Sequence, residues 1–495
     1  MMKSNRKVVM IALMMATFLT AIEGTIVSTA MPKIVSDLKG IELMNWVFSI
    51  FLLISATAVP IFGKLSDLFG RKSIFIVGTL IFLLGSTLCG FSQSMQQLIW
   101  FRALQGVGAG AILPVTSTII GDIFPVEQRA KMMGFMGMIW GIAGITGPLV
   151  GGFFVDQISW HWIFFMNIPF GIVAIIMIAV SLKESIEKKK HHIDYLGAIT
   201  FAISMISLLY ALQKGGEEHK WTTPTMLGLF ASFIAFLLIF LWIESKVKEP
   251  MMPLELFRSK VMAVSNAAAF LVSSVLIGLM VYIPMWVQGV LGQGATRAGF
   301  ASTPMSLTWM LGSFLCGRML VKNGQRAVGL LGTFVIIAGT VCLSFFQKDS
   351  MEFWFYPITA LIGLGFGLVI TLFTVSSQAA VDWSKRGVAT ASNTFFRTLG
   401  QTIGAALFGT YFNATLSNEI ARHPDLTMGQ MNQLINPEGT NALPAKIEAV
   451  LREILVSGLH HIFLVLIIIA VIAMLISANL PRETLESKKE KQHTA

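Results

Sequence analysis

The chain contains fourteen long apolar segments that are separated by polar connections. A helix needs about 20 predominantly apolar residues to cross a bilayer, and an α-helix satisfies its backbone hydrogen bonds within itself. Because 55% of the 495 residues are hydrophobic and only 13% are charged, little of the chain remains for soluble domains. The sequence therefore predicts an all-α polytopic membrane protein with fourteen transmembrane helices. These are expected to begin near Val8, Asn45, Ser73, Leu98, Lys131, Trp160, Tyr195, Thr225, Val261, Ala298, Val328, Phe353, Gly387 and Leu459.

Lysine and arginine are distributed unevenly between the two ends of these predicted helices. With a cytoplasmic N-terminus, 25 of the 36 Lys and Arg residues lie in cytoplasmic segments and 9 lie in the opposite loops. The positive-inside rule then predicts a multi-pass protein of the plasma membrane with both termini in the cytoplasm. Since this topology accounts for the net charge of +10, the charge does not indicate a nucleic-acid partner.

Sequence motifs for enzymatic chemistry are missing from the chain. It contains no G-x-x-x-x-G-K-[ST] loop, no H-E-x-x-H pair and no nucleophile elbow. Its three cysteines, Cys89, Cys316 and Cys342, all fall in predicted helices, and their spacing suggests neither a disulfide nor a metal site. We therefore expect no catalytic residues, no cofactor and no metal. The sequence carries no signal for an oligomeric state.

Two opposite charges lie inside predicted helices of the N-terminal region. At 1.5 Å per residue, Glu23 lies about 12 Å from the outer end of the first helix, and Arg102 about 8 Å from the outer start of the fourth. Intramembrane carboxylates often carry protons, so we predict that Glu23 and Arg102 form a proton-coupling pair, with Gln105 in a possible cavity. The alternatives are a static ion pair between two helices and a glutamate that snorkels into a wet crevice.

A glycine-rich polar turn joins the second and third predicted helices. Its sequence GKLSDLFGRKS contains Gly63, Asp67, Gly70, Arg71 and Lys72. Glycine permits a tight turn, and an acid among bases can form an ion-pair latch between helix ends. Taken alone, these bases could equally be topogenic charges. The turn resembles the G-x-L-a-D-r-x-G-r-k-x signature of the major facilitator superfamily, and its place between helices 2 and 3 fits that family.

Further motifs of the same superfamily follow in helices 4 to 6. RALQGVGAG at 102–110 is similar to its second drug-exporter motif, and GIAGITGPLVGG at 141–152 is similar to the third, which marks drug:proton antiporters. WHWIFFMNIPFG at 160–171 resembles the W-R-W-x-F-x-x-N-x-P-x-G stretch of the fourteen-helix drug:H+ antiporter branch, with His161 in place of the usual arginine.

The third motif also has a physical reading. Its small residues recur at spacings of three and four, which puts most of them on one helix face that can approach a neighbouring helix closely. These residues are Gly141, Gly144, Gly147, Pro148, Gly151 and Gly152.

The resemblance covers nearly the whole chain and implies a major facilitator fold, with two six-helix halves and two extra central helices. The predicted boundaries are 1–182 for the N-terminal half, 183–260 for the links and the extra helices, and 261–480 for the C-terminal half. An external loop at 412–458 and a cytoplasmic tail at 481–495 complete the prediction. The resemblance further implies a multidrug efflux antiporter in a bacterial cell membrane, associated with antibiotic resistance, whose partners are amphipathic small molecules, protons and the lipid bilayer.

An internal repeat supports two related halves. GKLSDLFGRK at 63–72 reappears as GRMLVKNGQR at 317–326, with an offset of 254, and GVGAGA at 106–111 reappears as GLGFGL at 363–368, with an offset of 257. At the second offset Arg129, which we include in the gating motif, matches Arg386.

The two copies differ at the charged positions. Arg102 corresponds to Thr359 and Pro148 to Ala405, so we expect the chemistry to be concentrated in the first half. Arg397 lies about 15 Å past the inner start of its helix. It is either a structural cation or a residue of the cavity.

Two rival functions remain open. One is a proton-coupled transporter of a specific metabolite, and the other is a membrane receptor or enzyme without transport. Efflux that depends on the proton gradient would distinguish the antiporter from both.

Overall fold

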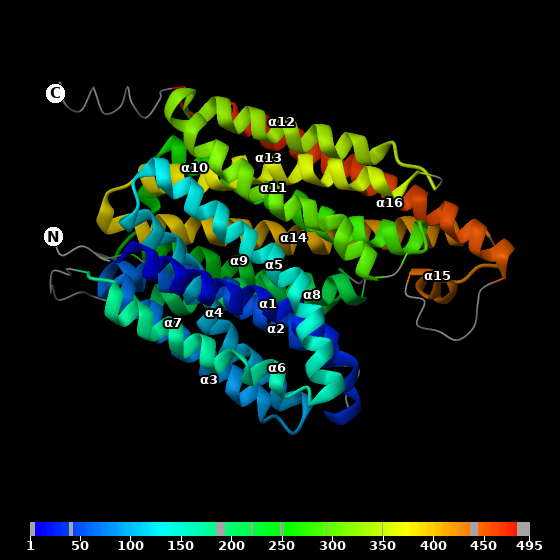
Figure 1. The fold of residues 1–495 in the computed structure, drawn as a ribbon, viewed down its shortest axis with the longest axis horizontal. Helices are drawn as coiled ribbons and strands as arrows, with labels where there is room; N and C mark the ends of the chain where they lie inside the picture. Colours follow the sequence, from blue (N-terminus) through cyan, green and yellow to red (C-terminus); the bar gives the residue numbers. More distant parts are fainter. Residues whose placement is uncertain are drawn as a thin grey trace. The chain divides into compact units, whose positions relative to one another are not determined.

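The computed structural model describes residues 5–38, 43–184, 194–218, 221–247, 250, 252–293, 295–348, 350–423, 425–435 and 444–482, and within these ranges the chain is helical without strands (Figure 1). Most of the link after the sixth predicted helix and most of the 481–495 tail lie outside them. The α-helices are α1 Arg6–Leu38, α2 Met44–Phe69, α3 Arg71–Gly90, α4 Met95–Ile123, α5 Val126–Gln157, α6 Trp162–Phe165, α7 Asn167–Ser181, α8 Tyr195–Glu218, α9 Pro224–Glu244, α10 Lys260–Met285, α11 Ala295–Lys322, α12 Gly324–Ser344, α13 Phe355–Ala379, α14 Arg386–Ile420, α15 Met428–Ile435 and α16 Ala445–Ser477.

Four short helical segments connect them. Leu254–Arg258, Glu352–Trp354 and Trp383–Lys385 are 3₁₀ turns, and Trp286–Val290 is a π-helical extension of α10.

Twelve of the described helical segments are long and apolar enough to cross a membrane. α11 and α14, with 28 and 35 residues, are not among these twelve. Polar residues along α14, such as Asn393, Arg397 and Gln401, lower its mean hydropathy. A long helix nevertheless begins within five residues of every predicted start except Trp160 and Leu459; near Trp160 the four-residue α6 begins at Trp162 and the longer α7 at Asn167.

The predicted loop at 412–458 is corrected at both ends. α14 continues to Ile420 and α16 already begins at Ala445, with the short helix α15 between them (Figure 1). Polar side chains end the apolar signal in the sequence without ending the helix, because backbone hydrogen bonds do not require apolar residues. The connection between the two long helices is therefore shorter than the hydropathy predicted.

The chain divides into two compact units. Unit 1 comprises Met1–Lys214, Trp221–Asn266 and Phe373–Phe396, and unit 2 comprises Gly215–Lys220, Ala267–Leu372 and Arg397–Ala495. Thus α9 and most of α8 belong to unit 1, and α13 and α14 contribute residues to both units. The units follow spatial contacts, whereas the boundaries predicted at 182 and 260 follow the order of helices along the chain.

Close helix packing in unit 1 depends on the glycines of α4. A Cβ atom added to Gly108 would meet backbone atoms of Gly78 and Phe82 on α3, and one added to Gly106 would meet the backbone of Phe51 on α2. Because backbone atoms cannot rotate away as a side chain can, even alanine would not fit these positions. The second motif therefore has a packing role in addition to any role of its polar residues.

Unit 2 repeats this packing at the offsets found in the sequence. A Cβ atom at Gly365 would meet backbone atoms of Gly332 and Ile336 on α12, and one at Gly363 would meet the carbonyl oxygen of Met305 on α11. Gly363 and Gly365 lie 257 residues after Gly106 and Gly108. The residues that they would meet lie 254 residues after those that the two glycines of unit 1 would meet.

The turns before α3 and α12 are also alike, because Gly70 and Gly324 both have a positive φ, of 89° and 79°. Side chains rarely tolerate this conformation. Together with the glycine contacts, the two turns confirm the internal repeat as a repeat of structure.

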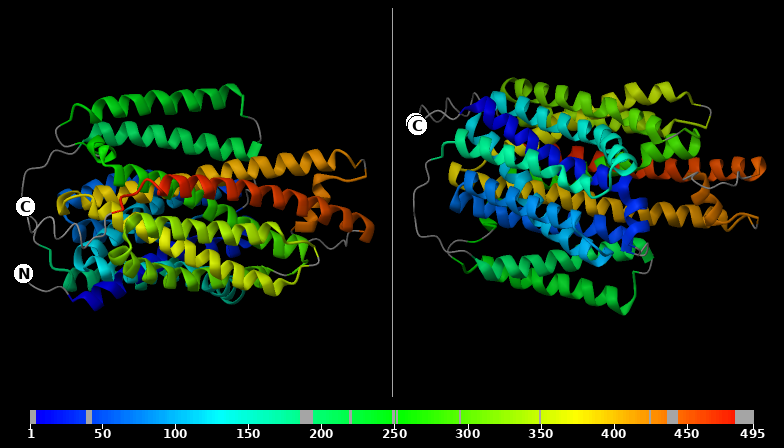
Figure 2. Two further views of the ribbon diagram at one scale, coloured as in Figure 1. Left: turned by 90° about the horizontal axis from the view of Figure 1, so that it is seen from above. Right: turned by 60° about the horizontal axis from the view of Figure 1, so that its bottom comes forward.

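The helices α8 and α9 form an antiparallel pair (Figure 2). Ser204 Oγ donates to the carbonyl oxygen of Phe233 at 3.0 Å, and Ser207 and Ser232 share a hydrogen bond of 3.0 Å. Thr223 caps α9 by accepting a hydrogen bond from the backbone of Met226. Small polar residues that bond across helices are typical of packing inside a bilayer.

Candidate functional site

The carboxylate of Glu23 lies at the centre of a buried polar cluster in unit 1. Glu23 is 0% and Arg102 1% exposed, and Arg102 Nη1 on α4 lies 2.5 Å from Glu23 Oε2 on α1. Gln105, one helical turn after Arg102, donates from Nε2 to Glu23 Oε1 at 2.8 Å. The structure thus brings together the two charges that the sequence singled out, and it places Gln105 inside their cluster.

The guanidinium of Arg102 is held from several sides. Nη1 also donates to Oε1 of Gln105 at 2.8 Å, and Nε donates to the carbonyl oxygen of Val47 on α2 at 3.2 Å. The ring of Phe51 lies 4.2 Å from the guanidinium carbon, within range of a cation–π interaction. A buried charge is tolerated only when it is paired and hydrogen-bonded, and Arg102 meets both conditions.

Asn167, the first residue of α7, is a third partner of the carboxylate that the sequence prediction missed. Its Nδ2 donates to Glu23 Oε1 at 2.6 Å and to Ser86 Oγ on α3 at 2.9 Å, and Ser86 Oγ donates to the carbonyl oxygen of Phe164 at 2.9 Å. The sequence contained a signal for it, because Asn167 matches the asparagine of the W-R-W-x-F-x-x-N-x-P-x-G pattern. As an uncharged residue in an apolar span, it was not selected.

The counterpart of Arg102 in unit 2 keeps one contact and loses the charge. Thr359 Oγ1 donates to the carbonyl oxygen of Ala301 at 2.9 Å, and Ala301 lies 254 residues beyond Val47. Arg102 on α4 therefore bonds the backbone of α2, and Thr359 on α13 bonds the backbone of α11 at the equivalent place of the repeat. The equivalent position of unit 2 thus carries an uncharged hydroxyl in place of the arginine of the buried ion pair.

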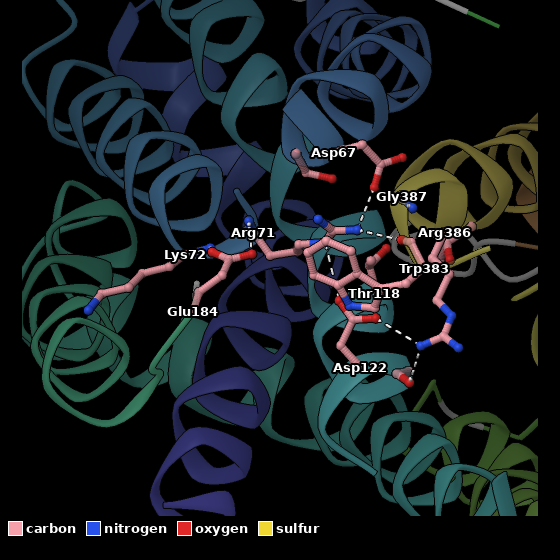
Figure 3. A network of polar contacts seen from close by, with 12 residues as sticks. Asp67, Arg71, Lys72, Thr118, Asp122, Glu184, Trp383, Arg386 and Gly387 are labelled. Atoms are coloured by element: carbon pink, nitrogen blue, oxygen red, sulfur yellow. Dashed lines mark hydrogen bonds and ion pairs between the residues drawn. The ribbon is translucent and has the colours of Figure 1, made fainter. Parts of the chain in front are cut away.

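A second polar network in unit 1 contains the predicted gating motif (Figure 3). Asp67 near the end of α2 accepts hydrogen bonds from the backbone N–H groups of Gly387 at 2.9 Å and Val388 at 2.8 Å. These groups belong to the first turn of α14, whose positive dipole end favours a carboxylate. A Cβ atom added to Gly63, one turn before Asp67, would meet Ala391 of the same helix, so glycine allows this close approach.

Arg71 and Asp122 extend the network into a chain of alternating charges. Arg71 Nη2 donates to Asp67 Oδ1 at 2.7 Å, and Arg71 Nε lies 3.2 Å from Asp122 Oδ2 on α4. Asp122 Oδ1 accepts a hydrogen bond from Arg386 Nη1 at 3.2 Å. Each acid thus contacts a base on another helix or at the adjoining turn (Figure 3).

The aromatic ring of Trp383 covers this chain of charges. The ring centre lies 4.1 Å from the guanidinium carbon of Arg71, and Arg71 Nη2 also donates to the Trp383 carbonyl oxygen at 2.9 Å. Arg386 was noted in the sequence only as the repeat of Arg129. Asp122 and Trp383 were not predicted, because nothing in the local pattern indicates which helix end they meet.

Glu184, beyond the end of α7, caps the N-terminus of α3. Its carboxylate accepts hydrogen bonds from the backbone N–H groups of Arg71 at 2.9 Å and Lys72 at 3.0 Å (Figure 3). The Lys72 ammonium donates to the carbonyl oxygen of Ala179 on α7. Lys72 therefore anchors α3 to α7, whereas the side chain of Arg71 joins the charged chain.

Arg129 is buried at the start of α5. Its Nε donates to the carbonyl oxygen of Phe124 at 2.9 Å, which satisfies an acceptor at the C-terminus of α4. Arg129 and Arg386 occupy equivalent positions in the repeat. Arg386 pairs with Asp122.

The small-residue motif of α5 contacts α1 along one edge. Cβ atoms added to Gly147 and Gly151 would meet Thr25 and Ile26 of α1, whereas those added to Gly144 and Gly152 would meet nothing within 4 Å. At 100° per residue the motif spans an arc of about 140°, so only its edge faces α1. The close approach to α1 is therefore made by Gly147 and Gly151; Gly141 and Pro148 lie in the same helix.

Arg397 lies in α14 within unit 2. Its Nε is buried and has no hydrogen-bond partner among the described residues.

The outer end of α1 meets the start of the WHWIFFMNIPFG stretch. Asp37 Oδ2 accepts a hydrogen bond from Trp160 Nε1 at 3.0 Å, and the hydrogen bond from Lys33 lowers the pKa of Asp37. His161 stacks on Trp160 at 3.8 Å between ring centres, and partial burial lowers its pKa below 6.5. This lowered pKa disfavours the charged imidazole, so His161 is a weaker source of positive charge than the arginine that it replaces.

Comparisons with known proteins agree with this architecture. A family model described as Major Facilitator Superfamily matches residues 13–405. The Multidrug transporter protein MdtP of Bacillus subtilis (strain 168) is 34% identical over 525 residues, covering 100% of this chain and 97% of the relative. The Multidrug resistance protein 3 of the same organism is 38% identical over 418 residues, covering 84% of this chain and 82% of the relative.

A solved structure is similar in fold. The human organic anion transporter MFSD10 (TETRAN) aligns with a TM-score of 0.61 at 11% identity, covering 94% of this chain and 100% of that one. At this identity the similarity concerns the fold alone.

Proposed function

Because this chain belongs to the major facilitator superfamily of membrane transporters, we propose that it exports amphipathic drugs or other toxic small molecules in exchange for protons. The fully buried ion pair of Glu23 and Arg102 carries this proposal. Buried pairs contribute little net stability compared with apolar residues of similar volume, and an intramembrane carboxylate is a common proton carrier. Relatives named multidrug transporter and multidrug resistance protein support the choice of substrate class.

Proton binding would change the cluster in a defined way. Protonation of Glu23 removes its negative charge and weakens its pairing with Arg102, so that Arg102 is left as an uncompensated buried cation. Substrate and proton would then compete for one arrangement of α1 and α4, and their alternation would bias which side of the protein opens.

The network of Asp67, Arg71, Asp122 and Arg386 would serve as the latch of that cycle. It joins the α2–α3 turn to the first turn of α14 through hydrogen bonds and ion pairs. Such contacts break and reform without repacking of an apolar core. The latch would therefore hold one conformational state and release it when Glu23 changes charge.

For the membrane topology we propose fourteen spanning helices, with α11 and α14 added to the twelve apolar ones, and two six-helix halves that flank α8 and α9. The excess of Lys and Arg on one side supports cytoplasmic termini, and the Bacillus relatives support a bacterial plasma membrane. Single cysteines placed near residues 5 and 482 should react with a membrane-impermeant thiol reagent only after permeabilisation. Labelling of intact cells would contradict this topology.

The proposed activity is tested with a fluorescent cationic dye. Cells that express the protein should accumulate less dye than cells that do not, and a protonophore should abolish the difference, because collapse of the proton gradient removes the driving force. A difference that persists after the gradient collapses would contradict proton coupling. No dye export together with gradient-dependent uptake of one metabolite would favour the second candidate, a proton-coupled metabolite transporter.

A further inference from the structure

In each hydrogen bond between Glu23 and another described side chain, the Glu23 carboxylate is the acceptor. Arg102 Nη1 bonds Oε2, and Gln105 Nε2 and Asn167 Nδ2 both bond Oε1. This arrangement suits an ionised carboxylate, which only accepts hydrogen bonds. A protonated carboxyl carries an O–H group that itself needs an acceptor, and an O–H group left unpaired at a fully buried position is costly.

Two of the three partners cannot supply that acceptor. Arg102 has no acceptor atom. The Gln105 oxygen already accepts hydrogen bonds from Arg102 at 2.8 Å and from the Cys89 thiol at 3.9 Å, so reversal of this amide would place its N–H₂ group against the guanidinium.

The amide of Asn167 differs from that of Gln105. Its Oδ1 is buried and has no hydrogen-bond partner within the described part of the chain. A half-turn of the amide brings Oδ1 to the place of Nδ2 and breaks no bond made by Oδ1. In that orientation Oδ1 faces both Glu23 and Ser86.

We propose that Asn167 is a positioning residue for proton binding, whose amide donates to ionised Glu23 and reverses to accept the O–H of protonated Glu23. This inference rests on the proposed role of Glu23. It adds the group that lets one buried site hold both protonation states, and it requires no covalent step.

The reversal also links protonation of Glu23 to the interruption of the helix between α6 and α7. Ser86 accepts from Asn167 Nδ2 and donates to the carbonyl oxygen of Phe164, the third residue of α6. After reversal, the Ser86 hydroxyl can rotate to donate to Asn167 Oδ1, which releases the Phe164 carbonyl. Since Asn167 is itself the first residue of α7, protonation would change the hydrogen bonds on both sides of this break.

Few other groups can disturb this titration. Among the described residues, Arg102 on α4 and the Cys89 thiol on α3 are the charged or titratable groups that interact electrostatically with Glu23. The other neighbours that bond the cluster from α2, α6 and α7 contribute Val47 and Phe164 carbonyls and the Asn167 amide, which do not titrate.

Infrared difference spectroscopy of the reconstituted full-length protein, between high and low pH, tests the proposal. The C=O stretching band of protonated Glu23 is identified by its loss in Glu23→Gln. In Asn167→Leu this band should persist but move to higher frequency, because its O–H has lost an acceptor. In Asn167→Ser, whose hydroxyl can accept a hydrogen bond, the band should stay closer to the wild-type frequency. Coupled dye transport by Asn167→Leu should fall about tenfold or more.

The outcomes separate this inference from the proposed function. If Glu23→Gln removes no carboxyl band, Glu23 is not protonated and the proton-coupling role itself fails. If the Glu23 band is present but is the same in Asn167→Leu, the reversing amide is excluded. The control is Asn266→Leu, which removes a different buried amide that bonds Ser392 and Asn393 and should leave the band unchanged; size-exclusion profiles establish that each variant is folded.

Discussion

Replacement of Glu23 by glutamine is expected to reduce proton-coupled efflux to the level of membranes without the protein. Glutamine has nearly the same volume and its oxygen can still accept a hydrogen bond from Arg102, but it cannot bind and release a proton. The measurement is gradient-driven dye transport in proteoliposomes with equal amounts of wild-type and variant protein. Coupled transport by Glu23→Gln at the wild-type rate would remove Glu23 from the mechanism.

The loss must be distinguished from misfolding. Glu23→Gln leaves the Arg102 charge without its counter-ion, and an uncompensated buried charge costs about 3–5 kcal/mol, so a lower apparent melting temperature is expected. Arg102 keeps its contacts with Val47, Gln105 and Phe51, which should allow the variant to insert and remain monodisperse. Glu23→Asp is the matched control, because it keeps the titratable group and should retain part of the coupled transport.

Replacement of Asp67 by asparagine is expected to slow transport by about tenfold or more. Both oxygens of Asp67 accept hydrogen bonds, from Arg71 and from the backbone N–H groups of Gly387 and Val388. An amide has one oxygen, so its N–H₂ group must face one of these donors. Because Asp67 and Arg71 side chains are only 4% and 3% exposed, solvent cannot compensate, and a change of about 1.4 kcal/mol shifts a conformational equilibrium tenfold.

The effect of Asp67→Asn is measured by the transport rate together with the rate at which a cysteine placed in the α2–α3 turn is labelled. We expect slower transport and a changed labelling rate in Asp67→Asn. The control is Glu453→Gln, the same acid-to-amide change in an exposed ion pair with Lys348, which is worth little. Equal effects of the two variants would show that Asp67 does not act as part of a latch.

Sequence patterns were sufficient to predict where most of the long helices lie and that Glu23 pairs with Arg102. The length of each apolar segment predicted the helices, because a bilayer demands about 20 residues per span. The repeat offsets of 254 and 257 predicted which glycines pack alike, and Gly108 and Gly365 do so. Glu23 and Arg102 could be paired from depth alone, since few partners exist for a charge inside a membrane.

Hydropathy was insufficient at two kinds of position. It ended the helices too early around 412–458, because the polar ends of α14 and α16 remain helical. It also overlooked Asn167, since one amide hardly changes the mean hydropathy of an apolar span. Glu184 was overlooked for a related reason, because a surface acid in a charged link looks like ordinary solvated charge.

The sequence by itself determined that this chain forms a helical membrane protein of repeated design with an acid and a base inside its first half, because these features depend on local periodicity, segment length and composition. Only the tertiary structure decided that Asn167 and Gln105 complete the hydrogen bonds of Glu23, and that Asp122, Trp383 and Arg386 complete those of the gating motif. Hydrogen bonds and ion pairs act over about 3 Å between helices whose residues are separated by up to 321 positions. No local pattern specifies which side chains meet at that distance.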